Sequence, residues 1–96
     1  MFVLALHVEL RLPGCRSLKD RRQAIKPILD GARHRFEVSA AEVGHQDKWQ
    51  RADLGFAAVS GQHHHVVDVI DEVERFVWSF PEVEVIGTER SWLDEG

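Results

Sequence analysis

The stretch FVLALHVELRL, residues 2–12, decides the fold because apolar side chains recur at every second position over eleven residues. Successive side chains of a strand point to opposite faces of its sheet, so this period predicts a strand with one buried face. Burial of each large apolar side chain stabilises a fold by about 1.5–3 kcal/mol, and we expect this strand to be the spine of the core. Its apolar face carries Phe2, Leu4, Leu6, Val8, Leu10 and Leu12, and its other face carries Val3, Ala5, His7, Glu9 and Arg11.

A helix is predicted after this strand. Pro13 and Gly14 end the strand, and Ser17 is suited to cap the helix because its hydroxyl can accept a hydrogen bond from a free amide of the first turn. Apolar residues then recur at helical spacing as far as residue 36. Pro27 lies inside this pattern and predicts a kink, since it removes one backbone hydrogen bond and crowds the preceding turn.

The rest of the chain predicts three more strands and a second helix. Residues 36–43 and 51–59 are strand-like, residues 63–80 carry an apolar stripe at helical spacing that Pro81 ends, and residues 83–86 form a short last strand. Residues 91–96 are expected to be a frayed acidic tail.

The order β-α-β-β-α-β indicates an α+β fold, the ferredoxin-like sandwich, as a single domain over residues 1–96. In this fold an antiparallel four-stranded sheet carries two helices on one face. The usual strand order, 4-1-3-2, makes residues 2–12 and 51–59 the central strands.

Composition is typical of a globular protein of the cytoplasm. The chain has 96 residues, of which 44% are hydrophobic and 29% charged, and a single cysteine, Cys15, excludes an internal disulfide framework. No apolar run approaches the roughly 20 residues that a membrane helix needs. We therefore expect no membrane partner.

Charge is distributed unevenly along the chain. Residues 16–35 contain seven Lys or Arg against two Asp, whereas residues 53–96 contain two Arg against ten Asp or Glu. The first helix is thus a candidate contact for the phosphates of RNA, with its N-terminus suited to an anion. Against this, the basic residues can form a solvated helix face, and an adjacent acidic helix would weaken their field. The candidate residues for RNA or anion binding are Arg16, Ser17, Lys19, Arg22, Lys26 and Arg33.

The sheet face opposite the helices is expected to be unusually apolar. Val3 and Ala5 lie on it, and the neighbouring strands add small apolar side chains whichever way they point. A solvated sheet face is normally more polar than this. A second copy of the chain is the simplest cover, so we expect a homodimer or higher oligomer. The alternative is a wet face rimmed by His7, Glu9 and Arg11.

The stretch GHQDKWQRADLG, residues 44–55, concentrates polar side chains and has three interpretations. An enzyme would use His45 as acid or base, Asp47 to orient it and Arg51 to hold an anion, at a subunit edge. A structural turn would use Asp47 as a cap. We favour an interface, because Trp and Arg are enriched at binding hot spots and no nucleophile is evident. The candidate interface residues are Val3, Ala5, His45, Asp47, Trp49 and Arg51.

Two further features do not predict chemistry. Consecutive helical residues project about 100° apart, so His63, His64 and His65 do not converge on one ion, although His64 and Asp68 offer two ligands. Cys15 follows Gly14 without a base at a recognisable spacing. We therefore assign no metal, no cofactor and no catalytic residue.

Three stretches resemble the bacterial YlxP-like proteins, a family of unknown function: LHVELRLPGCRSLKDRR (residues 6–22), FEVSAAEVGHQDKWQRADLGFAAVS (residues 36–60) and EVEVI (residues 82–86). The resemblance covers about residues 2–90 and implies the same ferredoxin-type fold. Genes of this family often lie among those for translation initiation and ribosome maturation, which implies a ribosome- or RNA-associated role. Cys15, Pro27 and the run 63–65 depart from the usual pattern.

The leading hypothesis is a small, non-enzymatic, oligomeric protein that associates with the ribosome or RNA. An adaptor that binds a protein through the open sheet face is the second hypothesis. An enzyme with a site at His45, Asp47 and Arg51 is the third.

Overall fold

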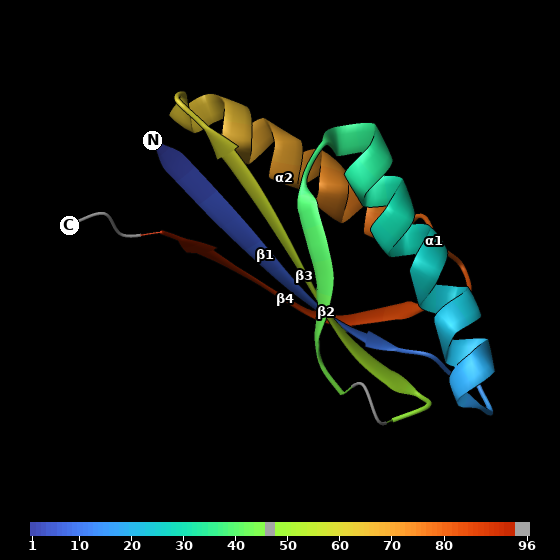
Figure 1. The fold of residues 1–96 in the computed structure, drawn as a ribbon. Helices are drawn as coiled ribbons and strands as arrows, with labels where there is room; N and C mark the ends of the chain where they lie inside the picture. The colour runs from blue at the N-terminus through green and yellow to red at the C-terminus, as the bar shows by residue number, and fades with distance from the viewer. Residues whose placement is uncertain (46–47, 94–96) are drawn as a thin grey trace.

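The computed structural model describes residues 1–45 and 48–93 and places two helices on one face of a four-stranded antiparallel sheet (Figure 1). The strand order β2-β3-β1-β4 confirms the expected topology and the two expected central strands. Along the chain the elements are β1 (Phe2–Arg11), α1 (Leu18–Phe36), β2 (Ser39–Gly44), β3 (Arg51–Ser60), α2 (His63–Trp78) and β4 (Glu84–Trp92).

The alternation of β1 organises the core as expected, with one exception. The apolar face from Leu4 to Leu12 is buried beneath the helices and meets Leu54, Phe56 and the apolar stripe of α2. Phe2, expected in the core, is 38% exposed. It lies at the first residue of the strand, where the helix layer ends, and its ring packs edge-on against His63.

Helix α1 begins where its cap was predicted. Ser17 accepts a hydrogen bond from the Asp20 amide, and the helix continues through Pro27 to Phe36. Gly31 faces α2 so closely that a Cβ atom there would lie 2.6 Å from Cζ of Phe76. The glycine therefore sets the distance between the two helices rather than weakening α1 alone.

Strand β4 is longer than predicted. It pairs with β1 up to the partners Leu4 and Trp92, and the Leu93 amide donates a hydrogen bond to the Val3 carbonyl. The prediction of a frayed tail from Ser91 is therefore wrong for residues 91–93, while residues 94–96 lie outside the described part. Backbone pairing with β1 holds this polar segment in the sheet, and Trp92 stacks on His63 at 4.5 Å between ring centroids.

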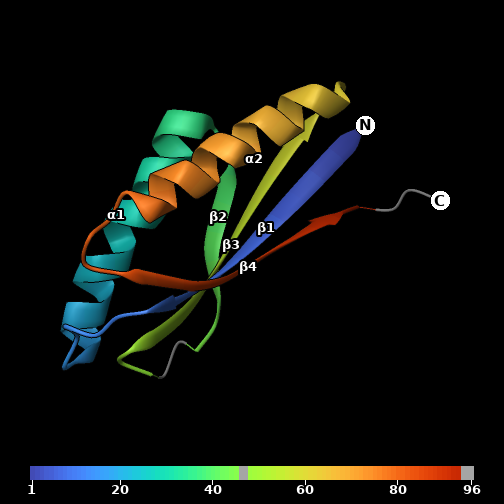
Figure 2. The same cartoon turned by 180° about the vertical axis from the view of Figure 1, so that it is seen from behind.

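The reverse view shows both helices on the same side of the sheet, with α2 running along β1 and β3 (Figure 2). The opposite face of the sheet, here called the open face, is covered by no described element. None of the described helices combines the length and the apolar character that crossing a membrane requires.

Candidate functional site

The centre of the open face is a shallow depression lined by small side chains. Its volume is about 410 Å³. Val43 leans across it, since a Cβ atom on Gly55 would lie 2.9 Å from the Val43 side chain. Val43 and Val59 are 59% and 63% exposed, so the expectation of an apolar open face is confirmed. The small lining residues are Ala5, Ser39, Ala41, Gly55, Ala57 and Ser91.

Charged side chains gather at one end of this depression, where β1 and β3 pair. His7 Nε2 lies 3.4 Å from Asp53 Oδ1, and His45 Nε2 lies 3.4 Å from Asp53 Oδ2. Glu9, the cross-strand partner of Asp53, forms an ion pair with Arg51. We call these five residues the polar cluster. They are partly exposed, and Asp53 is the least exposed at 17%.

A bulge in β2 brings His45 into the cluster. The pairing of β2 with β3 shifts register between Glu42 and Gly44, and His45 has a left-handed backbone with φ of 57°. Gly44 leaves room for the Asp53 carboxylate, because a Cβ atom there would lie 2.6 Å from Oδ2. The bulge re-aims one residue at a site formed by two other strands, as bulges beside functional sites commonly do.

A buried arginine of α1 holds this connection in place. Arg21, 3% exposed, donates hydrogen bonds to the carbonyls of His45 and Arg51 and pairs with Glu42 at 2.5 Å. Because the His45 carbonyl is fixed from α1, its left-handed conformation is supported by the core. Sequence analysis counted Arg21 only as part of the basic helix. Its place on the apolar side of the helix, four residues before Ile25, was the available signal.

The predicted interface residues are only partly together. Val3 and Ala5 lie on the open face, and Trp49 is exposed in the β2–β3 connection. Asp47 lies outside the described residues. Strand β2 ends at Gly44 and strand β3 begins at Arg51.

The polar cluster therefore differs from the enzyme site that the sequence offered. His45 lies beside Asp53, and Arg51 pairs with Glu9. Sequence analysis named His7 and Glu9 only as a polar rim of this face, and it did not single out Asp53. The alternation of β1 placed His7 and Glu9 on one face, but Asp53 needed the strand register, which alternation alone does not give.

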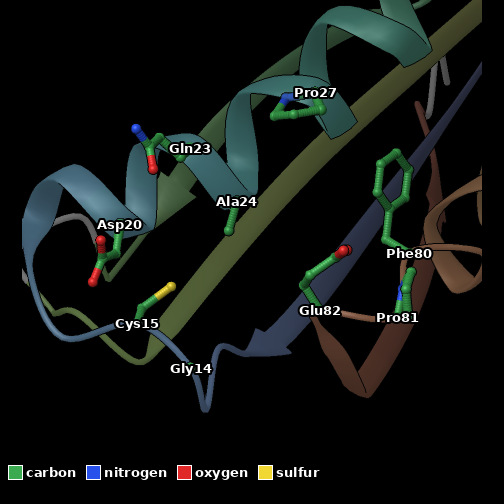
Figure 3. Close-up of a pocket in the computed structure, with 9 residues that line it drawn as sticks. All are labelled: Gly14, Cys15, Asp20, Gln23, Ala24, Pro27, Phe80, Pro81 and Glu82. Atoms are coloured by element: carbon green, nitrogen blue, oxygen red, sulfur yellow. The ribbon is translucent and has the colours of Figure 1, made fainter.

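Cys15 lines a pocket of about 620 Å³ (Figure 3). The pocket lies between the start of α1 and the α2–β4 connection, with Cys15 and Ala24 on one side and Phe80 and Glu82 on the other. Burial, and secondly the charge of Asp20, raise the pKa of the Cys15 thiol. None of the described residues that line this pocket is a histidine.

His63, the first residue of the histidine run in α2, packs against aromatic side chains. His63 stacks on Trp92 and meets the edge of Phe2. Within the described residues, the grouping whose ligand atoms lie within 4.8 Å of one another is Glu9, His45 and Asp53, and the run does not contribute to it.

Three basic residues of α1, Arg22, Lys26 and Arg33, lie on the side of the helix that faces β2. Arg33 donates a hydrogen bond to the Ala40 carbonyl, and a groove beside β2 is lined by Arg22, Lys26 and Arg33. Lys26 and Arg33 both pair with Asp30. The hydrogen bond from Lys26, with the two positive charges, lowers the pKa of the Asp30 carboxyl.

Two of the acidic side chains of α2 are directed away from the basic surface of α1, so they weaken its positive field less than expected. These two carboxylates, Asp71 and Glu74, point toward β4 and pair with Arg90. Among the residues that the structure describes, Arg16, Lys19 and Arg22 make no ion pair. Ser17 is occupied as the helix cap. Three basic residues without an ion pair in the described part of the chain therefore lie in, or just before, the first half of α1.

Comparison with known proteins gives the family. Residues 3–90 match the model of the family described as "Protein of unknown function (DUF503)". The chain belongs to this family. Over 77 residues it is 41% identical to a DUF503 relative from Bacillus subtilis (strain 168), "Uncharacterized protein YlxP", covering 80% of this chain and 84% of the relative. The predicted YlxP-like resemblance is thus confirmed.

A solved structure agrees with the fold of this DUF503 chain. "De novo designed protein Foldit4" matches with a TM-score of 0.54 at 12% identity, over 98% of this chain and 99% of the designed one. At that identity the likeness concerns the fold alone. "De novo designed protein Ferredog-Diesel" matches with a TM-score of 0.45 at 10% identity, over 96% and 84% of the two chains.

Proposed function

We propose that this chain is a non-enzymatic RNA-binding protein of the cytoplasm that contacts phosphates through α1 and associates with itself through the open face. The observation that carries the RNA contact is the position of the basic side chains. Arg22, Lys26 and Arg33 lie on the β2 side of α1. The carboxylates Asp71 and Glu74 of α2 are turned toward β4, where they share Arg90.

The first half of α1 is the strongest part of this surface. Lys19 and Arg22 lie three residues apart on one side of the helix, and Arg16 lies just before the capped N-terminus. Lys26 and Arg33 share Asp30, so they contribute less free charge. Neutralised phosphates release counterions, which makes such binding fall as salt rises.

A salt titration of binding to a structured RNA hairpin tests this proposal. Each phosphate contact adds about 0.7–0.9 to the slope of log affinity against log salt. The double variant Lys19→Glu with Arg22→Glu should bind more weakly and lower the slope by about 1.4–1.8. Arg75→Glu makes the same kind of charge change on the exposed side of α2 and is the matched control. Binding without salt dependence, or equal losses in both variants, contradicts the proposal.

Self-association is supported by the surface chemistry of the open face. Its centre is formed by Ala5, Ala57 and Gly55, which let a second sheet approach closely, and the exposed Val43 and Val59 border it. Stacked sheets lie about 10 Å apart, and small side chains are well suited to that packing. Association that buries an apolar face of this kind removes it from water and is therefore favoured.

Sedimentation at several protein concentrations tests the association. Val59→Asp places a charge on the open face and should shift the protein toward monomer. Trp78→Asp places the same charge at another exposed apolar residue, 59% exposed on the helix layer, and should leave the mass unchanged. A wild-type monomer at all concentrations, or an oligomer that Val59→Asp leaves intact, contradicts the proposed association.

A further inference from the structure

Three potential metal ligands from β1, β3 and the β2 bulge converge in the polar cluster. One ligand atom each from Glu9, His45 and Asp53 lies within 4.8 Å of the other two. His7 lies outside this grouping and reaches the other oxygen of the same carboxylate, with Nε2 3.4 Å from Asp53 Oδ1. We propose that Glu9, His45 and Asp53 bind a divalent transition-metal ion of the zinc class.

The spacing of the atoms favours coordination over hydrogen bonding. Each imidazole nitrogen lies 3.4 Å from an Asp53 oxygen, and neither contact has hydrogen-bond geometry. Asp53 Oδ1 is buried and has no hydrogen-bond partner. Ligand atoms that surround a tetrahedral Zn²⁺ at about 2.0–2.2 Å are about 3.3–3.6 Å apart. The nitrogen–oxygen separations of the cluster match that spacing.

The charges of the cluster leave a place for a cation. Glu9 and Asp53 carry two negative charges when ionised, and Arg51 supplies one positive charge, directed at Glu9. Asp53 faces neutral imidazoles on both sides unless they are protonated. A partly buried carboxylate is stabilised by an opposite charge close to it, and a metal ion held beside it by His45 and Glu9 would supply that charge.

The donor set selects the class of ion. Imidazole nitrogens suit zinc and its neighbours in the transition series, whereas Mg²⁺ and Ca²⁺ prefer oxygen ligands alone. Three side chains leave one position of a tetrahedral ion open for a water molecule. The ion would fasten the β2 bulge at His45 to the centre of the sheet at Glu9 and Asp53.

This inference is independent of the proposed RNA contact, because it concerns the open face and not α1. The test uses the full chain without an affinity tag and titrates Zn²⁺ by calorimetry and Co²⁺ by its visible absorption. Asp53→Asn and His45→Gln each remove one ligand and keep the side-chain size close to the original. His64→Gln, at an exposed histidine of α2, is the matched control.

The wild-type chain and His64→Gln should bind with equal affinity and show the Co²⁺ spectrum of a four-coordinate site. Asp53→Asn and His45→Gln should each bind at least about tenfold more weakly, since loss of an outer-shell partner alone reaches that size. Far-ultraviolet circular dichroism without metal confirms that each variant is folded. Because the two variants remove different ligands, a folding defect in one of them leaves the other as a test of the site. The inference is overturned if the wild type gives no Co²⁺ absorption, or if both variants retain wild-type affinity.

Discussion

Replacement of Arg21 with alanine is expected to be among the most destabilising single changes in this protein. The guanidinium is 3% exposed and makes an ion pair with Glu42 and two hydrogen bonds to the carbonyls of His45 and Arg51. Removal of one partner of a buried ion pair costs about 3–5 kcal/mol, because the other charge stays behind without compensation. A chain of 96 residues has a total stability of about 5–14 kcal/mol.

Urea denaturation followed by tryptophan fluorescence measures this loss. Arg22→Ala is the matched control, because Arg22 is the next residue of the same helix, is exposed and makes no ion pair within the described chain. It should change the free energy of unfolding by less than about 0.5 kcal/mol. A loss below about 1 kcal/mol for Arg21→Ala, or equal losses for the two variants, would refute the reasoning that Arg21 holds the β2–β3 connection.

Four smaller predictions follow from local structure. Ser17→Ala should lower the free energy of unfolding by about 1 kcal/mol in urea, since it removes the helix cap; no change contradicts this. Gly31→Ala gains about 1 kcal/mol of helix preference. The added methyl group also overpacks Phe76, at a cost of about 1–3 kcal/mol. Calorimetry should therefore show a lower Tm, and a higher Tm contradicts the packing argument. Because the pKa of Cys15 is raised by burial, its alkylation at pH 8 should be much slower in the folded chain than in urea, and equal rates contradict this. The pKa of the Asp30 carboxyl is lowered in the folded state, so its contribution to stability is present above the unfolded pKa and is lost as pH falls through the folded pKa. Asp30→Asn should remove that part of the acid dependence of Tm. An unchanged profile of Tm against pH contradicts this prediction.

The fold was accessible from sequence because its signals are local. The alternation of residues 2–12 and the apolar stripe of α2 each depend on one segment, and the topology that joins them is the simplest with both helices on one face. The end of β4 was missed for the opposite reason. Its polar residues are held by backbone pairing with β1, which leaves no mark on side-chain composition.

The polar cluster was only partly predictable because it depends on register. His45 was a candidate by residue type, but its neighbour is Asp53, and that contact requires both the β1–β3 pairing and a bulge in β2. A shift of one residue in either strand pair would turn these side chains to opposite faces. The role of Arg21 was hidden for a similar reason, since its partners are backbone carbonyls far along the chain.

The central depression and the polar cluster share two strands, and Ala5 is only two residues from His7 on the same face. Any molecule that covers the depression also removes water from beside Asp53 and so strengthens every charge interaction there. Occupancy of the face and the ionic state of the cluster are therefore linked, and the linkage is reciprocal. A change in pH or in bound cations that alters the cluster will shift the affinity of the face for any such molecule by the same factor that the molecule imposes on the cluster.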